Sequence, residues 1–133
     1  SGMPITALYA SLLAPLFLIL AIRVIRVRRG TRVAVGDGGN ALLARRMRVH
    51  ANFAEYVPLA LILMMLAESL ATSPWLMHVL GVALVAGRIA HAYGVSQMQE
   101  NFRFRVTGMF ITFWMLGVAA LACLWGAIAR AIG

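Results

Sequence analysis

The sequence has few charged residues and no lysine. Charged side chains occupy 12% of its 133 positions, whereas soluble domains use about 25%. Hydrophobic residues make up 62% of the chain, well above the ~45–50% of soluble domains. So little polar surface excludes a fold covered by water, and we predict that most of the chain lies in lipid.

Cysteine and metal-ligand patterns are equally sparse. The chain has one cysteine, Cys123, inside an apolar run, which excludes an intramolecular disulfide and a multi-cysteine metal site. No group of His, Glu and Asp has the spacing of metal ligands, so no metal site is predicted. The formal net charge of +8 comes from arginine, but no soluble basic surface with interleaved aromatic residues is available to bind nucleic acid.

Four stretches are apolar and long enough to cross a bilayer, which takes about 20 residues each. They lie at residues 4–25, 45–71, 74–95 and 105–132. They predict an all-α integral membrane protein, a four-helix transmembrane bundle that forms one domain over residues 3–133. The first stretch has no basic start and too long an apolar run for a cleavable signal peptide. Residues 1–2, Ser-Gly before a methionine, are expected to be the remnant of an expression tag.

Arginine positions predict the orientation in the membrane. Eight of the 12 arginines flank the first connection, two flank the third, and the second connection has none. By the positive-inside rule, the first and third connections face the cytoplasm and both termini lie on the other side. We expect a multi-pass protein of a bacterial inner membrane, or of an ER-type membrane if the source is eukaryotic. The ten arginines are Arg23, Arg26, Arg28, Arg29, Arg32, Arg45, Arg46, Arg48, Arg103 and Arg105.

Two groups of polar residues interrupt the apolar stretches. The second stretch carries Arg45, Arg48, Asn52 and Glu55 at spacings of three, four and three, which places them on one helix face. The third carries Arg88 and His91, three residues apart. Ionisable residues within spans are costly and mark functional sites by default.

These groups allow two interpretations. The side chains could reach the headgroups or form structural ion pairs, with Glu55 pairing to Arg48 or Arg88. Alternatively, one carboxylate among several arginines leaves positive charge for an anionic ligand. His50 also fits an interfacial position beside the lipid headgroups. Arg28 and Arg105 lie at matching depth, so all these groups could share one pocket near the cytoplasmic interface.

Residues 48–58, RVHANFAEYVP, resemble the second-helix signature of the MAPEG family, the membrane-associated proteins in eicosanoid and glutathione metabolism. The segment Gly87–His91 resembles the third-helix motif of that family, and Arg105 with Gly108 resembles the start of its fourth helix. Microsomal glutathione transferases belong to this family.

The resemblance implies a homotrimer that binds glutathione, as co-substrate, between neighbouring subunits near the cytoplasmic face. By position, Arg105 would be the catalytic arginine that stabilises the glutathione thiolate; Arg103 fits the spacing to Gly108 less well. Some relatives carry tyrosine where this chain has His91, and Tyr93 lies on another face. The residues expected to contact glutathione are Arg28, Arg48, His50, Asn52, Glu55, Tyr56, Arg88 and His91.

The function implied is a glutathione transferase or peroxidase that acts on lipophilic electrophiles from the bilayer. The alternative is a non-catalytic lipid- or glutathione-binding protein of the same fold, because the family also contains such members. A small transporter is the third possibility, and polar groups confined to one interface rather than spread to the midplane argue against it.

Overall fold

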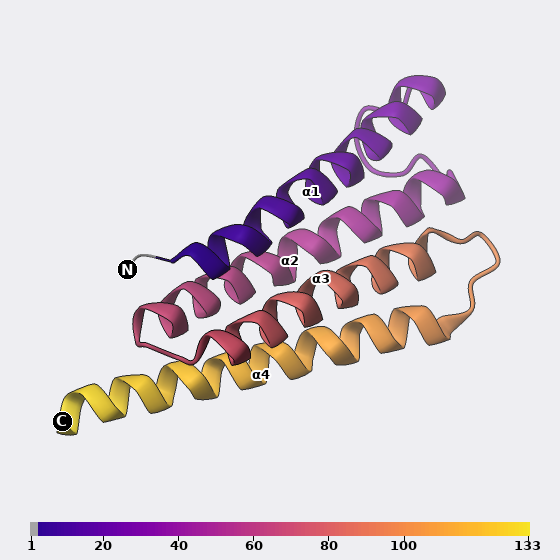
Figure 1. The fold of residues 1–133 in the computed structure, drawn as a ribbon. Helices are drawn as coiled ribbons and strands as arrows, with labels where there is room; N and C mark the ends of the chain where they lie inside the picture. The colour runs from indigo at the N-terminus through magenta and orange to yellow at the C-terminus, as the bar shows by residue number, and fades with distance from the viewer. Residues whose placement is uncertain (1–2) are drawn as a thin grey trace.

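Residues 3–133 of this computed structural model form four long helices that run antiparallel in chain order (Figure 1). They are α1 (Pro4–Thr31), α2 (Ala41–Ser69), α3 (Pro74–Ser96) and α4 (Phe102–Ile132). Each is long and apolar enough to cross a membrane, and residues 3–133 contain no strand. The predicted all-α, four-helix membrane fold is confirmed. Residues 1–2, expected to be a tag remnant, lie outside the described residues.

Three helices extend beyond the predicted apolar stretches at the arginine-rich end. α1 continues to Thr31 rather than residue 25, α2 begins at Ala41 rather than residue 45, and α4 begins at Phe102 rather than residue 105. Hydropathy marks where the hydrocarbon ends, whereas arginine favours the helix on either side of that boundary. The 28 residues of α1 span about 42 Å, against about 30 Å of hydrocarbon, so its last turns project into the interface.

The connections and termini divide between the two ends of the bundle. Both termini and the α2–α3 connection lie at one end, and the connections at residues 32–40 and 97–101 lie at the other (Figure 1). The arginine-rich connections therefore share one end, as predicted. In the first of them Gly36, Gly38 and Gly39 adopt positive φ angles, a conformation that glycine reaches without steric cost.

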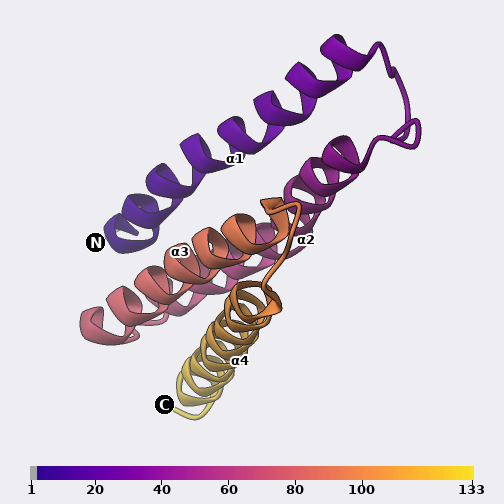
Figure 2. The same ribbon diagram turned by 90° about the vertical axis from the view of Figure 1, so that its right-hand side faces the viewer.

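The α2–α3 pair forms the centre of the bundle. Both helices pack against each other and against α1, and both also pack against α4. Within residues 3–133, α1 and α4 do not touch, and they lie on opposite sides of the central pair (Figure 2). The core between the helices is apolar and includes Leu13, Met64, Leu84 and Met115.

The N-terminus of α1 is capped by a carboxylate from another helix. No side chain at the N-cap position of α1 makes a capping hydrogen bond. Instead Glu68 of α2 accepts hydrogen bonds from the backbone amides of Ile5 and Thr6, at 3.0 and 2.8 Å, and from the Thr6 hydroxyl at 2.7 Å. A carboxylate at this position satisfies free amides and complements the helix dipole.

Glycines allow the backbones of α3 and α4 to approach closely. A Cβ atom on Gly108 would lie 2.6 Å from both the Gly87 carbonyl oxygen and the His91 amide nitrogen, and one on Gly94 would lie 2.8 Å from the Arg105 amide nitrogen. Small residues commonly permit such contacts between membrane helices. This packing sets the position of the first turns of α4, including Arg105, against the end of α3.

Replacing Gly108 with alanine should therefore destabilise the bundle. The added methyl group meets backbone atoms that cannot move independently, and overpacking of this kind costs about 1–3 kcal/mol. Thermal unfolding in detergent would measure the loss. Gly117→Ala on the same helix is the matched control, because a Cβ there has no neighbour within 4 Å; equal stability of the two variants would contradict the packing argument.

Candidate functional site

Arg88 of α3 lies in the interior of the bundle and contacts two other helices. Its side chain is almost completely buried, with 1% exposure. One guanidinium nitrogen, Nη2, donates to Asn52 Oδ1 of α2, and Nη1 donates to Thr112 Oγ1 of α4 at 3.4 Å. The guanidinium also lies 5.9 Å from the ring centre of Phe53. Arg88 thus cross-links α2, α3 and α4.

No carboxylate lies within ion-pair distance of Arg88 among residues 3–133, and its Nε has no hydrogen-bond partner there. His91, one helical turn further along α3, places Nδ1 3.5 Å from Arg88 Nη2 and is also buried. The sequence predicts that both residues complete the ligand site. The structure places both side chains beneath the protein surface. Arg88 connects α2, α3 and α4, whereas the polar contact of His91 is to Arg88 on the same helix.

Arg48 and Glu55 form an ion pair along α2, one of the two pairings that the sequence left open. Both side chains are about half exposed, at 51% and 58%. Glu55 lies 14 residues from the start of α2 at Ala41, about 21 Å along the helix axis. A charged pair at that depth on an outward face of the protomer would be costly against lipid.

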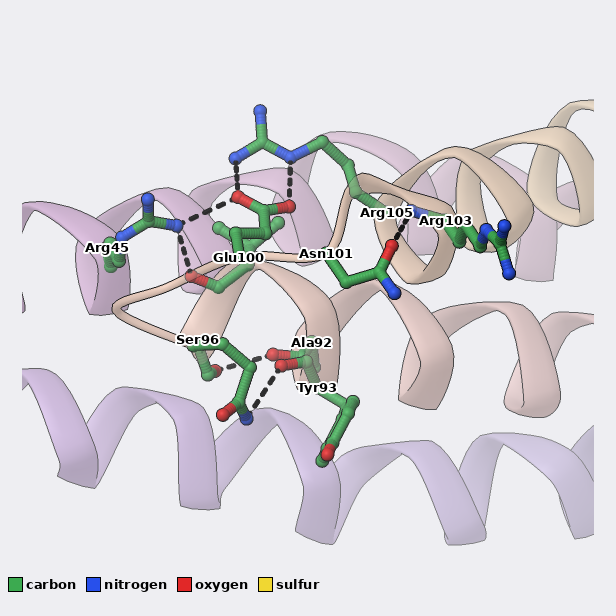
Figure 3. A network of polar contacts seen from close by, with 10 residues as sticks. Arg45, Ala92, Tyr93, Ser96, Glu100, Asn101, Arg103 and Arg105 are labelled. Carbon is green, nitrogen blue, oxygen red and sulfur yellow. Dashed lines mark hydrogen bonds and ion pairs between the residues drawn. The ribbon is translucent and has the colours of Figure 1, made fainter.

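A second group of charges surrounds Glu100 in the α3–α4 connection. Glu100 accepts two hydrogen bonds from Arg105, from Nε at 2.8 Å and from Nη2 at 2.6 Å, and one from Arg45 Nη1 at 2.8 Å (Figure 3). The Glu100 side chain is 1% exposed. Arg45 Nη1 also donates to the carbonyl oxygen of Val95 at 3.0 Å. These contacts join α2, the end of α3 and the first turn of α4.

Glu100 stays ionised at neutral pH. Burial alone would raise the pKa of this carboxyl, but the hydrogen bonds and positive charges of Arg45 and Arg105 outweigh burial and hold the pKa below its ordinary value. Glu100 was not among the residues predicted from the sequence. Its position in the sequence could have identified it, since Glu100 is one of only four acidic residues in the chain and lies five positions before Arg105.

A cleft of about 310 Å³ opens beside these arginines. This volume is near the lower end of the range for small-molecule sites. The small side chains of α2 at Ala41 and Ala44 leave room for it. The structure thus brings Arg48 and Arg105, predicted separately from α2 and α4, to one cleft within a single protomer. Its lining residues are Ala41, Ala44, Arg45, Arg48, Val95 and Arg105.

Three other predicted residues make different contacts. Arg28 donates to the carbonyl oxygens of Val33 and Gly36, at 3.3 and 2.7 Å, and so holds the first connection. The His50 ring packs on Phe17 of α1, 5.0 Å between ring centres. Tyr56 packs edge-on against Phe113 of α4 at 5.5 Å and lies 6.0 Å from the Arg88 guanidinium. None of the three lines the arginine cleft.

Two of the larger hollows lie away from this cleft. One, of about 610 Å³, is at the opposite end of the bundle and includes Trp125 and Arg130. The other, of about 450 Å³, is a groove between α1 and α2 lined only by apolar and aromatic side chains, including Phe17, Phe53 and Pro58. We place the candidate site at the arginine cleft, although it is smaller, because several charged side chains converge on it. Volume alone does not identify a binding site.

The Arg88 contacts predict a specific stability effect. Asn52→Leu removes the principal acceptor of a buried guanidinium, and leaving such a donor unsatisfied costs about 1–3 kcal/mol. Thr112→Val removes a longer contact and should cost less. Thermal unfolding in detergent would rank the variants. Full stability of Asn52→Leu would show that Arg88 does not depend on Asn52.

Known proteins match this chain over nearly its whole length. A family model described as the MAPEG family matches residues 6–129. The chain is 40% identical over 121 residues to the inner membrane protein YecN of Escherichia coli strain K12, an alignment that covers 91% of each chain. It shows the same identity and coverage with YecN of Escherichia coli O6:H1 strain CFT073.

Proposed function

Because the chain belongs to the MAPEG family, we propose that it binds glutathione in the arginine cleft and uses the thiolate against lipophilic electrophiles. The observation that carries this proposal is the convergence of Arg48 of α2 and Arg105 of α4 on one cleft. In the transfer reaction the thiolate forms a C–S bond at an electrophilic carbon and displaces a leaving group. In the alternative reaction two glutathione molecules are oxidised to the disulfide while a lipid hydroperoxide is reduced to the alcohol and water.

The charges of the cleft complement those of glutathione. Glutathione has two carboxylates and one ammonium group. Arg45, Arg48 and Arg105 supply positive charge at the cleft, and guanidinium groups bind carboxylates with paired hydrogen bonds. Glu55, ion-paired to Arg48, is the group that would receive the ammonium. Asn52 and Tyr56, on the same helix, remain proposed contacts of glutathione.

Arg105 is the proposed catalytic residue. A thiol with a pKa near about 8.5 is mostly protonated at neutral pH, and an adjacent cation lowers that pKa and raises the fraction of thiolate. A guanidinium fixed beside the sulfur stabilises the developing negative charge without a covalent intermediate. The Arg105 side chain is 38% exposed, so a solute in the cleft can reach it.

The proposed assembly is a homotrimer with glutathione sites between subunits. Support comes from the Arg48–Glu55 pair, which is half exposed on the isolated protomer although it lies deep along a membrane-spanning helix. A neighbouring copy that covers this face of α2 would remove the charges from lipid. Arg28, His50, Arg88 and His91 remain proposed contributors, through positioning or through contacts that form in the assembly.

The proposed location is a bacterial inner membrane, with the arginine-rich end in the cytoplasm. The relatives are named as inner membrane proteins, and the arginine distribution gives the orientation. Glutathione is abundant on that side. A lipophilic acceptor would arrive through the bilayer.

A non-catalytic glutathione-binding protein is the second candidate. One observation favours it: Glu100 already occupies two donor groups of Arg105, Nε and Nη2. Such a protein would bind glutathione in calorimetry and show no turnover with a broad panel of electrophiles and hydroperoxides.

Arg105→Ala should lower kcat/KM for conjugation of glutathione to a chlorodinitrobenzene-type acceptor by about 100-fold or more, because it removes the cation that stabilises the thiolate. Arg103→Ala is the matched control. It removes the same charge from an exposed side chain on the same helix that points away from Glu100 (Figure 3), and should leave the rate within about twofold.

Calorimetry with glutathione separates the two candidate functions. Normal turnover in the Arg105→Ala variant would remove Arg105 from the mechanism. Binding without turnover in the unmodified protein would favour the non-catalytic alternative, and absence of binding would overturn both.

A further inference from the structure

Glu100 holds the position on Arg105 that an anionic ligand would need. Its two carboxylate oxygens face Nε and Nη2 of Arg105 in the paired geometry that arginine adopts with ligand carboxylates (Figure 3). One of these oxygens is shared with Arg45. Two of the three arginines that line the cleft are therefore bound to a carboxylate of the chain itself.

We propose that Glu100 is an internal carboxylate that occupies the anion position of Arg105 and Arg45 in the unliganded protein and is displaced by an anionic group of glutathione. This inference rests on the proposed glutathione function and adds a residue that tunes affinity and selectivity. Glu100 touches the two arginines rather than the reacting atoms.

The position of Glu100 in the chain makes displacement feasible. It belongs to the five-residue connection 97–101, not to a helix. Its neighbours Gln97, Met98 and Gln99 are exposed, so no buried side chain anchors this part of the connection. The carboxylate can leave while α3 and α4 stay packed through Gly87, Gly94 and Gly108.

Both arginines keep another contact when Glu100 leaves. The Arg105 guanidinium lies 5.4 Å from the ring centre of Phe102, and Arg45 still donates to the Val95 carbonyl. A residue needed only to hold these guanidiniums would leave them without support once removed. Here each guanidinium has one further contact that does not involve Glu100, which favours competition with a ligand over a purely structural role.

The charges at the cleft determine which ligands can displace Glu100. The cleft contains three arginines, and Glu55 and Glu100 neutralise two of the three charges. A ligand with one anionic group makes only the contact that Glu100 already makes, and it also loses translational freedom on binding, so it displaces Glu100 poorly. A ligand with several, placed to engage Arg48 as well as Arg105, gains contacts that Glu100 cannot make. The internal carboxylate thus selects for multiply charged anions over small ones.

Glu100→Gln tests the proposal, since it keeps the size of the side chain and removes the charge. If Glu100 occupies the arginines about 90% of the time, its removal should tighten glutathione binding about tenfold in calorimetry, because the competent fraction rises from about 0.1 towards one. Glutathione thiolate absorbance should also become detectable at lower pH in this variant. Unchanged or weaker binding by folded protein would overturn the proposal and assign Glu100 a structural role.

A second measurement needs no glutathione. Phenylglyoxal modifies free guanidinium groups, and peptide mass spectrometry can compare Arg105 with exposed Arg103 as an internal reference. The ratio of Arg105 to Arg103 labelling should rise several-fold in Glu100→Gln. Equal ratios in the two proteins would overturn the role of Glu100. Absence of glutathione binding by the unmodified protein would instead overturn the proposed function on which the ligand assignment rests.

Glu100→Asp covers the case in which the Gln variant fails to fold. It keeps the charge but withdraws the carboxylate by one methylene, which weakens the paired contact with Arg105. Labelling of Arg105 and affinity for glutathione should then fall between the unmodified protein and the Gln variant. A value for Glu100→Asp equal to that of the unmodified protein would contradict displacement.

Discussion

The buried guanidinium of Arg88 joins the three helices on which the candidate site depends. A cation at that depth cannot be left without acceptors, because lipid and apolar side chains offer none. Asn52 of α2 and Thr112 of α4 supply them. These contacts require α2, α3 and α4 to keep one rotational setting relative to one another. Arg45, Arg48 and Arg105, on α2 and α4, lie at one cleft because that setting is maintained.

The two carboxylates near the cleft have opposite surroundings. Glu55 is half exposed on the outer face of α2 and pairs with one arginine, whereas Glu100 is covered and pairs with two. In the proposed function, the first meets a ligand or a neighbouring subunit, and the second competes with the ligand for two arginines of its own protomer. A chain with only four acidic residues thus has two of them at one site.

Most of the fold could be predicted because hydropathy depends on local sequence. The helices and the shared end of the arginine-rich connections followed from apolar length and arginine count. Helix ends were missed where α1 continues past Ile25, since an arginine-rich turn outside the hydrocarbon remains helical. The α2 spacing also predicted that Arg48 could pair with Glu55, because residues seven apart share a face.

Contacts between segments distant in sequence could not be predicted from local sequence patterns. The position of Glu100 between Arg45 and Arg105 depends on how a short connection folds back over α2. His50 faces Phe17 of α1 because of the rotation of α2, which its own spacing does not specify. The resemblance to a family grouped these residues by role, and the structure separates them into a buried cross-link, an ion pair on α2 and the Glu100 contacts.

The separation of α1 from α4 has a consequence for how molecules find the protein. Because these helices stand on opposite sides of the central pair, each presents exposed apolar side chains on its own flank of the protein, and a flank that no neighbouring copy covers borders the bilayer. A water-insoluble molecule dissolved in the membrane searches for such a flank in two dimensions, at the concentration set by its partitioning into lipid. In the proposed reaction, glutathione diffuses to the protein through water, whereas the acceptor diffuses within the plane of the membrane. The membrane itself therefore concentrates one of the two reactants.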